Sequence, residues 1–306
     1  MDSLAVAPPA GAPITGETVA AWDISYDDQA ACRMPDGVEL YYEERGHGPH
    51  LTLINNFFLI CPVWRALTQQ LAQRNRLLTY DLRNQGASSR VGMEHRFSEH
   101  ADDLLHLLDH LGVEGTYLVG TSISTLIGLD FARAHPDRVK GLVLVGPVFS
   151  PYGTLRRKLL AKSWLRSLDN GGAANLFNMI YPLVFGDRTL ESGGKPAYLA
   201  VRERFLALNS EAQIRVSLTA SLSADDSPER LREVASPTLL MVGDADFQWS
   251  PSSLAAATAL FPRARGEIIP GTGHLPFFEA TQAFEQSVQR FVDECESGSF
   301  VAGGVA

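Results

Sequence analysis

Short apolar runs alternate with helix-like segments along most of this 306-residue chain, and this alternation limits the folds that it can form. The apolar runs are predicted to be strands, and they span residues 51–55, 76–83, 116–120, 141–146, 238–244 and 266–270. Apolar residues recur at helical spacing in the segments between these runs, which predicts helices over residues 63–74, 100–113, 123–135, 252–261 and 281–295. Strands that alternate with helices indicate an α/β fold, in which helices cover both faces of a mostly parallel sheet.

Two stretches depart from the alternation. Residues 32–46 alternate apolar and polar positions around an Asp-Gly pair, which predicts an antiparallel hairpin. Residues 150–235 contain helical segments and no clear strand, so we expect a helical lid inserted after a central strand. Ligands of open parallel sheets bind at the carboxyl ends of the strands, and a lid at this place in the chain would cover that edge.

These patterns divide the chain into a core and three other parts. The core is predicted over residues 29–149 and 236–296, and the helical lid occupies residues 150–235. Residues 1–28 are rich in Ala, Pro and Gly, and we expect them to form a flexible leader. Residues 297–306 are expected to form a frayed tail.

Composition excludes several classes of protein and site. The formal net charge of −9 argues against a nucleic-acid-binding surface. The three cysteines are far apart, which argues against a zinc site and suits a reducing compartment. No apolar run reaches the about 18 residues of a membrane span, and the N-terminus lacks the basic region of a signal peptide. We therefore predict a cytoplasmic protein that needs neither a metal nor an organic cofactor.

The segment LVGTSISTLIG, residues 118–128, gives the strongest local signal. Here an apolar strand turns directly into a helix, with Ser122 at the turn. Such a sharp turn needs small residues on both sides, and Gly120 and Ser124 provide them. The helix N-terminus supplies free N–H groups that suit a developing negative charge. The alternative interpretation is that Ser122 only caps the helix.

Three motifs together resemble the α/β-hydrolase superfamily, over about residues 34 to 293. The usual elbow of that superfamily is G-x-S-x-G, and this chain has G-T-S-I-S at 120–124. The Gly-rich loop PGTGHLPFFE, residues 270–279, follows the last predicted strand and resembles the superfamily's histidine loop. The segment G-D-A-D at 243–246 resembles the G-x-x-D segment that supplies the acid.

This resemblance implies a role for each matching residue. Ser122 would be the nucleophile, His274 its base, and Asp246 the acid that orients the imidazole, with Asp244 as the competing candidate. The backbone N–H groups of Phe57 and Ile123 would form the oxyanion hole. YDLRNQGASS, residues 80–89, resembles the loop D-x-R-G-x-G-x-S of the superfamily, and we interpret it as structural.

Several residues are candidates for the substrate pocket. Asn55 and Asn56 replace the usual His-Gly pair, and they either preserve the loop shape or contact the substrate carbonyl. Phe58, Trp249 and Tyr181 would line an apolar pocket together with the aromatic stretches 164–168 and 176–185. The alternative is that these stretches form the lid's own core. The basic segment RRKLLAK, residues 156–162, either meets an acyl carrier protein or is a solvated helix face.

An activated serine in this setting predicts a serine hydrolase that acts on an ester or thioester of an apolar acyl group through acyl-Ser122. Two alternatives stay open. One is a tailoring enzyme of secondary metabolism that uses His274 as base to eliminate a small acid or to transfer an acyl group. The other is a ligand-binding receptor or scaffold on the same fold.

Overall fold

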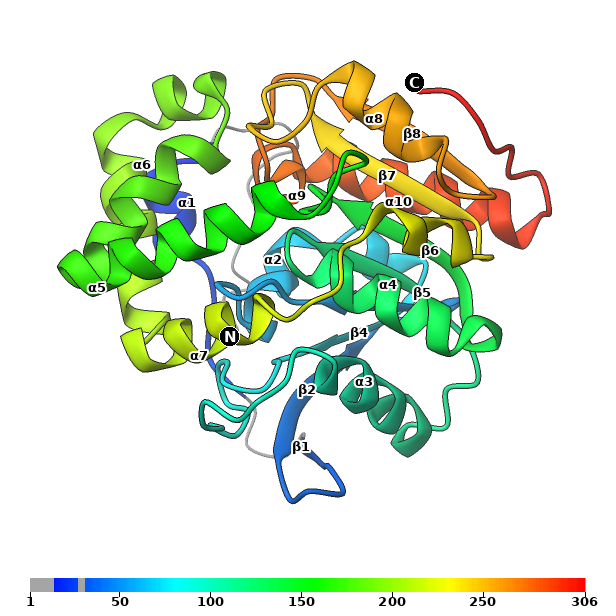
Figure 1. Ribbon diagram of the computed structural model, residues 1–306, viewed down its shortest axis with the longest axis horizontal. Coiled ribbons are helices and arrows are strands. Elements are labelled where there is room, and N and C mark those ends of the chain that lie inside the picture. The colour runs from blue at the N-terminus through cyan, green and yellow to red at the C-terminus, as the bar shows by residue number, and fades with distance from the viewer. Residues whose placement is uncertain (1–13, 27–30, 306) are drawn as a thin grey trace, which may run out of the picture.

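The computed structural model describes residues 14–26 and 31–305, and its centre is an eight-stranded sheet (Figure 1). The strands are β1 Ala31–Arg33, β2 Glu39–Arg45, β3 His50–Ile54, β4 Arg76–Tyr80, β5 Thr116–Thr121, β6 Val139–Val145, β7 Thr238–Gly243 and β8 Ala264–Ile269. Their order is β1-β2-β4-β3-β5-β6-β7-β8. β1 and β2 form the predicted antiparallel hairpin, and the strands from β4 to β8 pair in parallel. The mostly parallel sheet predicted from the alternation is confirmed.

The helices are α1 Gly16–Ala20, α2 Trp64–Leu67, α3 Glu99–His110, α4 Ser124–Ala134, α5 Leu155–Val184, α6 Asp187–Leu208, α7 Glu211–Ser221, α8 Pro251–Thr258, α9 Pro276–Glu279 and α10 Thr281–Glu296. Short 3₁₀ turns cover Cys61–Val63, Leu71–Gln73, Pro136–Arg138 and Pro228–Glu233. Within the described part of the chain, no helix is both long and apolar enough to cross a membrane.

Helices pack on both faces of the sheet, as the alternation predicts. Successive side chains of a strand point to opposite faces. In β6, Gly141 lies against the Phe291 ring of α10, and the next residue, Leu142, lies against Gly128 of α4. The side chains of β3, β5 and β7 are buried along their whole length because both faces are covered.

The predicted helix over residues 63–74 is wrong beyond its first turn. The Thr68 hydroxyl donates to the Trp64 carbonyl, and the backbone at Thr68 leaves the helical region. The next free N–H groups, those of Gln70 and Leu71, donate to the Glu285 carboxylate of α10. A carboxylate far along the chain therefore takes the donors that would otherwise continue the helix.

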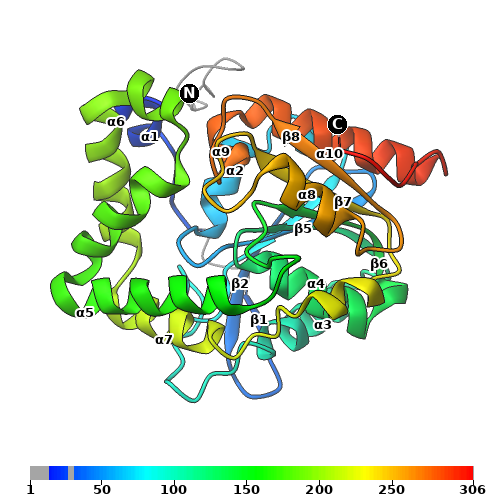
Figure 2. The same ribbon diagram turned by 45° about the horizontal axis from the view of Figure 1, so that its top comes forward.

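Helices α5, α6 and α7 form the predicted helical insertion between β6 and β7. They stand as a group beside the carboxyl ends of the strands, and both views separate them from the sheet (Figures 1 and 2). Two of them bend at glycines with positive φ, α5 at Gly172 (68°) and α6 at Gly194 (51°). Both helices therefore change direction at a glycine.

The expectation of a flexible leader needs correction for residues 14–26, and the rest of that predicted leader lies outside the described residues. Thr15 caps α1 by a reciprocal pair of hydrogen bonds with Thr18. Val19 is buried, and α1 lies side by side with α6 in both views (Figures 1 and 2). An apolar side chain within the Ala- and Pro-rich sequence therefore finds a partner in the insertion.

The tail is also more ordered than expected. Gly303 N donates to Ala264 O at 2.7 Å, and Gly266 N donates to Gly304 O at 3.1 Å. These bonds place the described end of the tail along the outer edge of β8, where an edge strand has unpaired backbone groups.

Candidate active site

Ser122 occupies a sharp turn between β5 and α4, with a φ of 53° that non-glycine residues rarely adopt. A Cβ at Gly120 would lie 2.8 Å from the Ser124 carbonyl oxygen, so only glycine fits there. Ser124 Oγ accepts from Thr121 N at 2.8 Å and lies 2.8 Å from Ile54 O, to which it donates. The serine that replaces the usual glycine thus adds hydrogen bonds to the turn.

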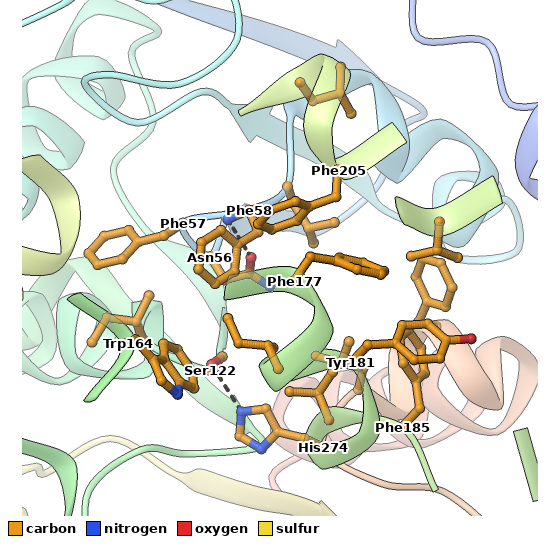
Figure 3. A pocket seen from close by; sticks show the side chains of 18 of the residues that line it. Asn56, Phe57, Phe58, Ser122, Trp164, Phe177, Tyr181, Phe185, Phe205 and His274 are labelled. Carbon is orange, nitrogen blue, oxygen red and sulfur yellow. Dashed lines mark hydrogen bonds between the residues drawn. The ribbon is translucent and has the colours of Figure 1, made fainter. Parts of the chain in front are cut away.

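The His274 imidazole connects Ser122 to Asp246. His274 Nε2 lies 3.0 Å from Ser122 Oγ, a contact that Figure 3 shows, and His274 Nδ1 lies 2.9 Å from Asp246 Oδ2. His274 follows β8 and Asp246 follows β7, so both come from the carboxyl edge of the sheet. His274 and Asp246 are 2% and 5% exposed, which shields their contact from water.

Asp244 lies outside this arrangement. Its Oδ1 accepts from Gly271 N at 2.8 Å and from Thr272 N at 3.2 Å. Asp244 therefore holds the start of the histidine loop, whereas Asp246 contacts the imidazole itself. Of the two competing carboxylates, the structure brings only Asp246 to His274.

The histidine loop is also tied to the helical insertion. His274 N donates to Val184 O, the last residue of α5, at 2.8 Å. The Glu279 carboxylate accepts from Gly273 N and from Gly186 N, each at 2.8 Å. Burial raises the pKa of Glu279. This role was not predicted from the sequence, because Glu279 stands only at the end of a short apolar segment.

Asn55 does not line the pocket, so its predicted role there is wrong and the alternative, that it preserves the loop shape, agrees with the structure. Its Nδ2 donates to Asp81 Oδ1 at 3.2 Å, and its Oδ1 accepts from Trp64 Nε1 at 2.6 Å. Asp81 also accepts from Cys61 N at 2.6 Å and Ala87 N at 3.0 Å. Burial raises the pKa of Asp81 to about 6. Asn55 therefore belongs to a buried polar network that supports the loop after β3.

The next residues of that loop lie at the pocket. Asn56 Oδ1 accepts from Phe58 N at 2.9 Å, which tightens the turn. Within the described chain, no protein atom accepts a hydrogen bond from the backbone N–H of Phe57 or of Ile123. Both residues line the same pocket as Ser122. Two residues that line the pocket together with Ser122 thus keep free backbone donors.

The pocket above Ser122 and His274 is mainly apolar. Asn56, Phe58 and Tyr181 line it, as the sequence suggested. Trp249 does not line it, because its Nε1 donates to Pro147 O at 2.7 Å and its ring packs edge-on against Phe149. Trp249 therefore belongs to the core beneath the site.

One side of this pocket is a continuous series of aromatic rings, which we call the aromatic wall. Neighbouring ring centroids are 4.8 to 6.3 Å apart. In order of contact the rings are Trp164, Phe58, Phe205, Phe177, Tyr181, Phe185, Phe278 and Trp22. Figure 3 shows six of them arranged around Ser122 and His274. Phe205, Phe278 and Trp22 were missed from the sequence, since they lie outside its aromatic stretches.

The basic segment 156–162 does not form a single exposed patch. Arg157 is 5% exposed, and its guanidinium pairs with Asp226 at 2.8 Å. It also donates to Ser221 O at 2.6 Å. Within the predicted basic segment, Arg157 is therefore structural. Among the described residues, no group of His, Cys, Asp and Glu side chains is arranged to hold a metal ion.

Comparison with known proteins identifies the family of this chain. A profile of the family described as alpha/beta hydrolase fold matches residues 49–281. The pimeloyl-[acyl-carrier protein] methyl ester esterase of Nitrosospira multiformis is 24% identical over 265 residues, which cover 83% of this chain and 98% of that protein. The 2-(acetamidomethylene)succinate hydrolase of Mesorhizobium japonicum is 25% identical over 283 residues, which cover 89% of this chain and 99% of that protein.

Two further relatives differ in coverage and in what they show. The putative carbamate hydrolase RutD of Azorhizobium caulinodans is 34% identical over 119 residues, or 39% of this chain and 45% of that protein. The solved esterase of Thermogutta terrifontis superposes with a TM-score of 0.76 at 24% identity, over 87% of this chain and 97% of that one, and shows the shared fold. From the profile match over most of its length and from these relatives, the chain belongs to the alpha/beta hydrolase fold family and is a hydrolase-type enzyme.

Proposed function

We propose that this protein is a serine hydrolase that cleaves an ester or thioester of an apolar acyl group through an acyl-Ser122 intermediate. The observation that carries the proposal is the hydrogen-bonded series Ser122, His274 and Asp246 at the base of an apolar pocket. A nucleophile in contact with a base, and a base in contact with an orienting carboxylate, is the arrangement that activates a serine hydroxyl.

In the first step, Ser122 Oγ attacks the carbonyl carbon while His274 Nε2 accepts the hydroxyl proton. Asp246 accepts a hydrogen bond from His274 Nδ1–H, which fixes the tautomer and stabilises the imidazolium. The carbonyl oxygen becomes an oxyanion. The free N–H groups of Phe57 and Ile123 donate to it, a contribution that is usually the largest electrostatic one in acyl transfer.

In the second step, the imidazolium of His274 gives its proton to the leaving alcohol or thiol, and acyl-Ser122 remains. Water then attacks the acyl carbon, with His274 again accepting the proton. The ester linked to Ser122 breaks, the hydroxyl regains its proton from His274, and the free acid leaves. Each proton that enters the imidazole thus leaves it within one turnover.

The lining of the pocket supports an uncharged, apolar acyl group. The aromatic wall offers large apolar area and no full charge. Two arginines are among the described lining residues: the buried Arg157 is paired with Asp226, and the half-buried Arg204 donates to Ala20 O. The relative from Nitrosospira multiformis is named as an esterase of a pimeloyl-[acyl-carrier protein] methyl ester, which supports an ester as the substrate class.

A fluorophosphonate probe tests the proposal, because it labels only an activated serine. We expect intact-mass analysis to find one adduct on the wild-type protein and none on Ser122→Ala or His274→Ala. Ser252→Ala and His47→Ala are matched controls at exposed positions, and they should label like the wild type. A folded wild-type protein that takes no label, or a Ser122→Ala variant that is still labelled, would overturn the acyl-Ser122 mechanism.

Hydrolysis of p-nitrophenyl esters then tests the acyl preference. We expect kcat/KM to rise from acetyl to octanoyl esters, because each buried methylene gains about 0.8 kcal/mol. A preference for the acetyl ester would contradict the apolar substrate class while leaving the serine mechanism intact.

A further inference from the structure

The segment 14–26 lies outside the part of the chain that matches the family, which begins at residue 49. Three of its side chains nevertheless line the pocket of Ser122, namely Val19, Trp22 and Ile24. A part of the chain that the family profile does not include therefore contributes to the surface that an acyl group would touch.

Close backbone contacts hold this segment on the insertion. A Cβ at Gly16 would lie 3.1 Å from the Pro196 carbonyl oxygen of α6, and a Cβ at Gly193 would lie 2.8 Å from Ile14 O. The Arg204 guanidinium of α6 donates to Ala20 O at 2.8 Å. Glycines let the two backbones approach each other, and the arginine fixes the end of α1.

The same segment is held on the core. The Trp22 ring packs edge-on against Phe278 of α9, with centroids 4.9 Å apart and an angle of 81°. Asp23 pairs with Arg65 of α2 at 3.3 Å. Phe278 follows His274 by only four residues, so Trp22 is fixed against the loop that carries the imidazole. The segment therefore spans from the insertion to the core at one end of the aromatic wall.

We propose that Trp22 is a specificity-determining residue, which closes the end of the aromatic wall and selects for acyl chains long enough to reach it. The identity of the bound group as an acyl chain rests on the proposed function. A short acyl group lies near Ser122 and gains nothing from Trp22. A longer one buries its terminal methylenes against the indole ring, and this apolar contact favours the longer chain.

The test compares Trp22→Ala with the wild-type full chain on p-nitrophenyl acetate and p-nitrophenyl octanoate. We expect the octanoate-to-acetate ratio of kcat/KM to fall about tenfold. Trp22→Phe keeps a ring against Phe278 and should retain most of the ratio. Glu17→Ala, an exposed position on the same short helix, is the control and should match the wild type. An unchanged ratio in folded Trp22→Ala would overturn the proposal.

A binding measurement separates this proposal from the reaction. N-phenyl-1-naphthylamine, an uncharged apolar fluorophore, is titrated into Ser122→Ala alone and combined with Trp22→Ala, Trp22→Leu or Glu17→Ala. We expect Kd to rise about tenfold with Trp22→Ala, less with Trp22→Leu, and not with Glu17→Ala. If no ester is hydrolysed but Kd rises when Trp22 is replaced, the proposed reaction is wrong, and the proposal that Trp22 closes the aromatic wall is supported. If Kd is unchanged by both Trp22 substitutions in folded protein, the proposal that Trp22 closes the aromatic wall is wrong.

Discussion

The two sides of the pocket are built from different interactions. On the core side polar groups form specific hydrogen bonds, such as His274 with Asp246 at the pocket and Asn55 with Asp81 behind the loop that lines it. The insertion side consists of aromatic rings in mutual contact, such as Phe177 with Phe205 at 5.3 Å. Hydrogen bonds weaken steeply when their geometry changes, whereas apolar contacts depend mainly on buried area. We infer that the core sets the reaction and the insertion, with segment 14–26, sets the range of substrates.

The largest expected effect tests whether the reaction depends on the hydrogen bond between His274 and Asp246. Asp246→Asn offers His274 Nδ1 an amide in place of a carboxylate, which favours the wrong tautomer. We expect kcat/KM to fall by roughly 10³- to 10⁴-fold. Asp244→Asn is the matched control, because an amide oxygen still accepts from Gly271 N and Thr272 N. An equal loss in both variants would show that the two carboxylates act through the loop and not through the imidazole.

The second prediction concerns the pH dependence of the core network. Burial raises the pKa of Asp81 from 3.8 to about 6. The folded state therefore holds its proton more tightly than the unfolded state, and the stability that Asp81 contributes is lost as pH rises through about 6. Between pH 4 and pH 7 the wild type should lose on the order of 2 kcal/mol relative to Asp81→Asn.

Urea unfolding of both proteins at several pH values checks this sign. A difference between the two free energies of unfolding that stays constant from pH 4 to pH 7 would contradict it. The pH dependence of stability would then not distinguish the polar core from the apolar insertion side of the pocket.

The third prediction concerns the elbow itself. Ser124→Ala leaves Thr121 N without an acceptor and removes the donor to Ile54 O. An unsatisfied buried donor costs about 1–3 kcal/mol, so we expect a loss of about 2 kcal/mol in the free energy of unfolding. Ser223→Ala, at an exposed position in the turn after α7, is the control for loss of a serine hydroxyl. Equal stability of Ser124→Ala and the wild type would show that the hydroxyl is dispensable for the turn.

The smallest expected effect is on the insertion side. Phe205→Ala removes ring contacts with Phe58 and Phe177 in the aromatic wall. We expect KM for p-nitrophenyl octanoate to rise about fivefold, equivalent to about 1 kcal/mol of lost apolar contact, while kcat changes little. A fall in kcat with constant KM would break the division of roles between the two sides.

The sequence allowed the fold and the centre of the site to be predicted for one physical reason. The carboxyl ends of parallel strands meet at one sheet edge, so Ser122, Asp246 and His274 converge once β5, β7 and β8 are recognised. The hydrogen bonds among these side chains agree with that expectation. The catalytic roles of the three residues remain predictions that the labelling experiment tests.

The failed expectations share a different cause, which is contact between distant parts of the chain. Asn55 is a pocket candidate by sequence, with loop support as its alternative role, and its contacts with Asp81 and Trp64 hold the side chain in the core. Segment 14–26 is predicted to be part of a flexible leader because its local sequence does not indicate that α1 packs against α6. Local patterns indicate which element forms, and they do not indicate which distant group satisfies its side chains.

The hydrogen bonds between the histidine loop and the end of α5 affect the design of chimeras that exchange the helical insertion between family members. His274 N donates to Val184 O, and Glu279 accepts from Gly186 N. By chain order Val184 and Gly186 belong to the insertion, but by contact they belong to the loop that carries the imidazole. A chimera that receives a foreign insertion should therefore keep residues 184–186 of the recipient. Splice points drawn at the ends of β6 and β7 would exchange part of the reaction centre together with the pocket.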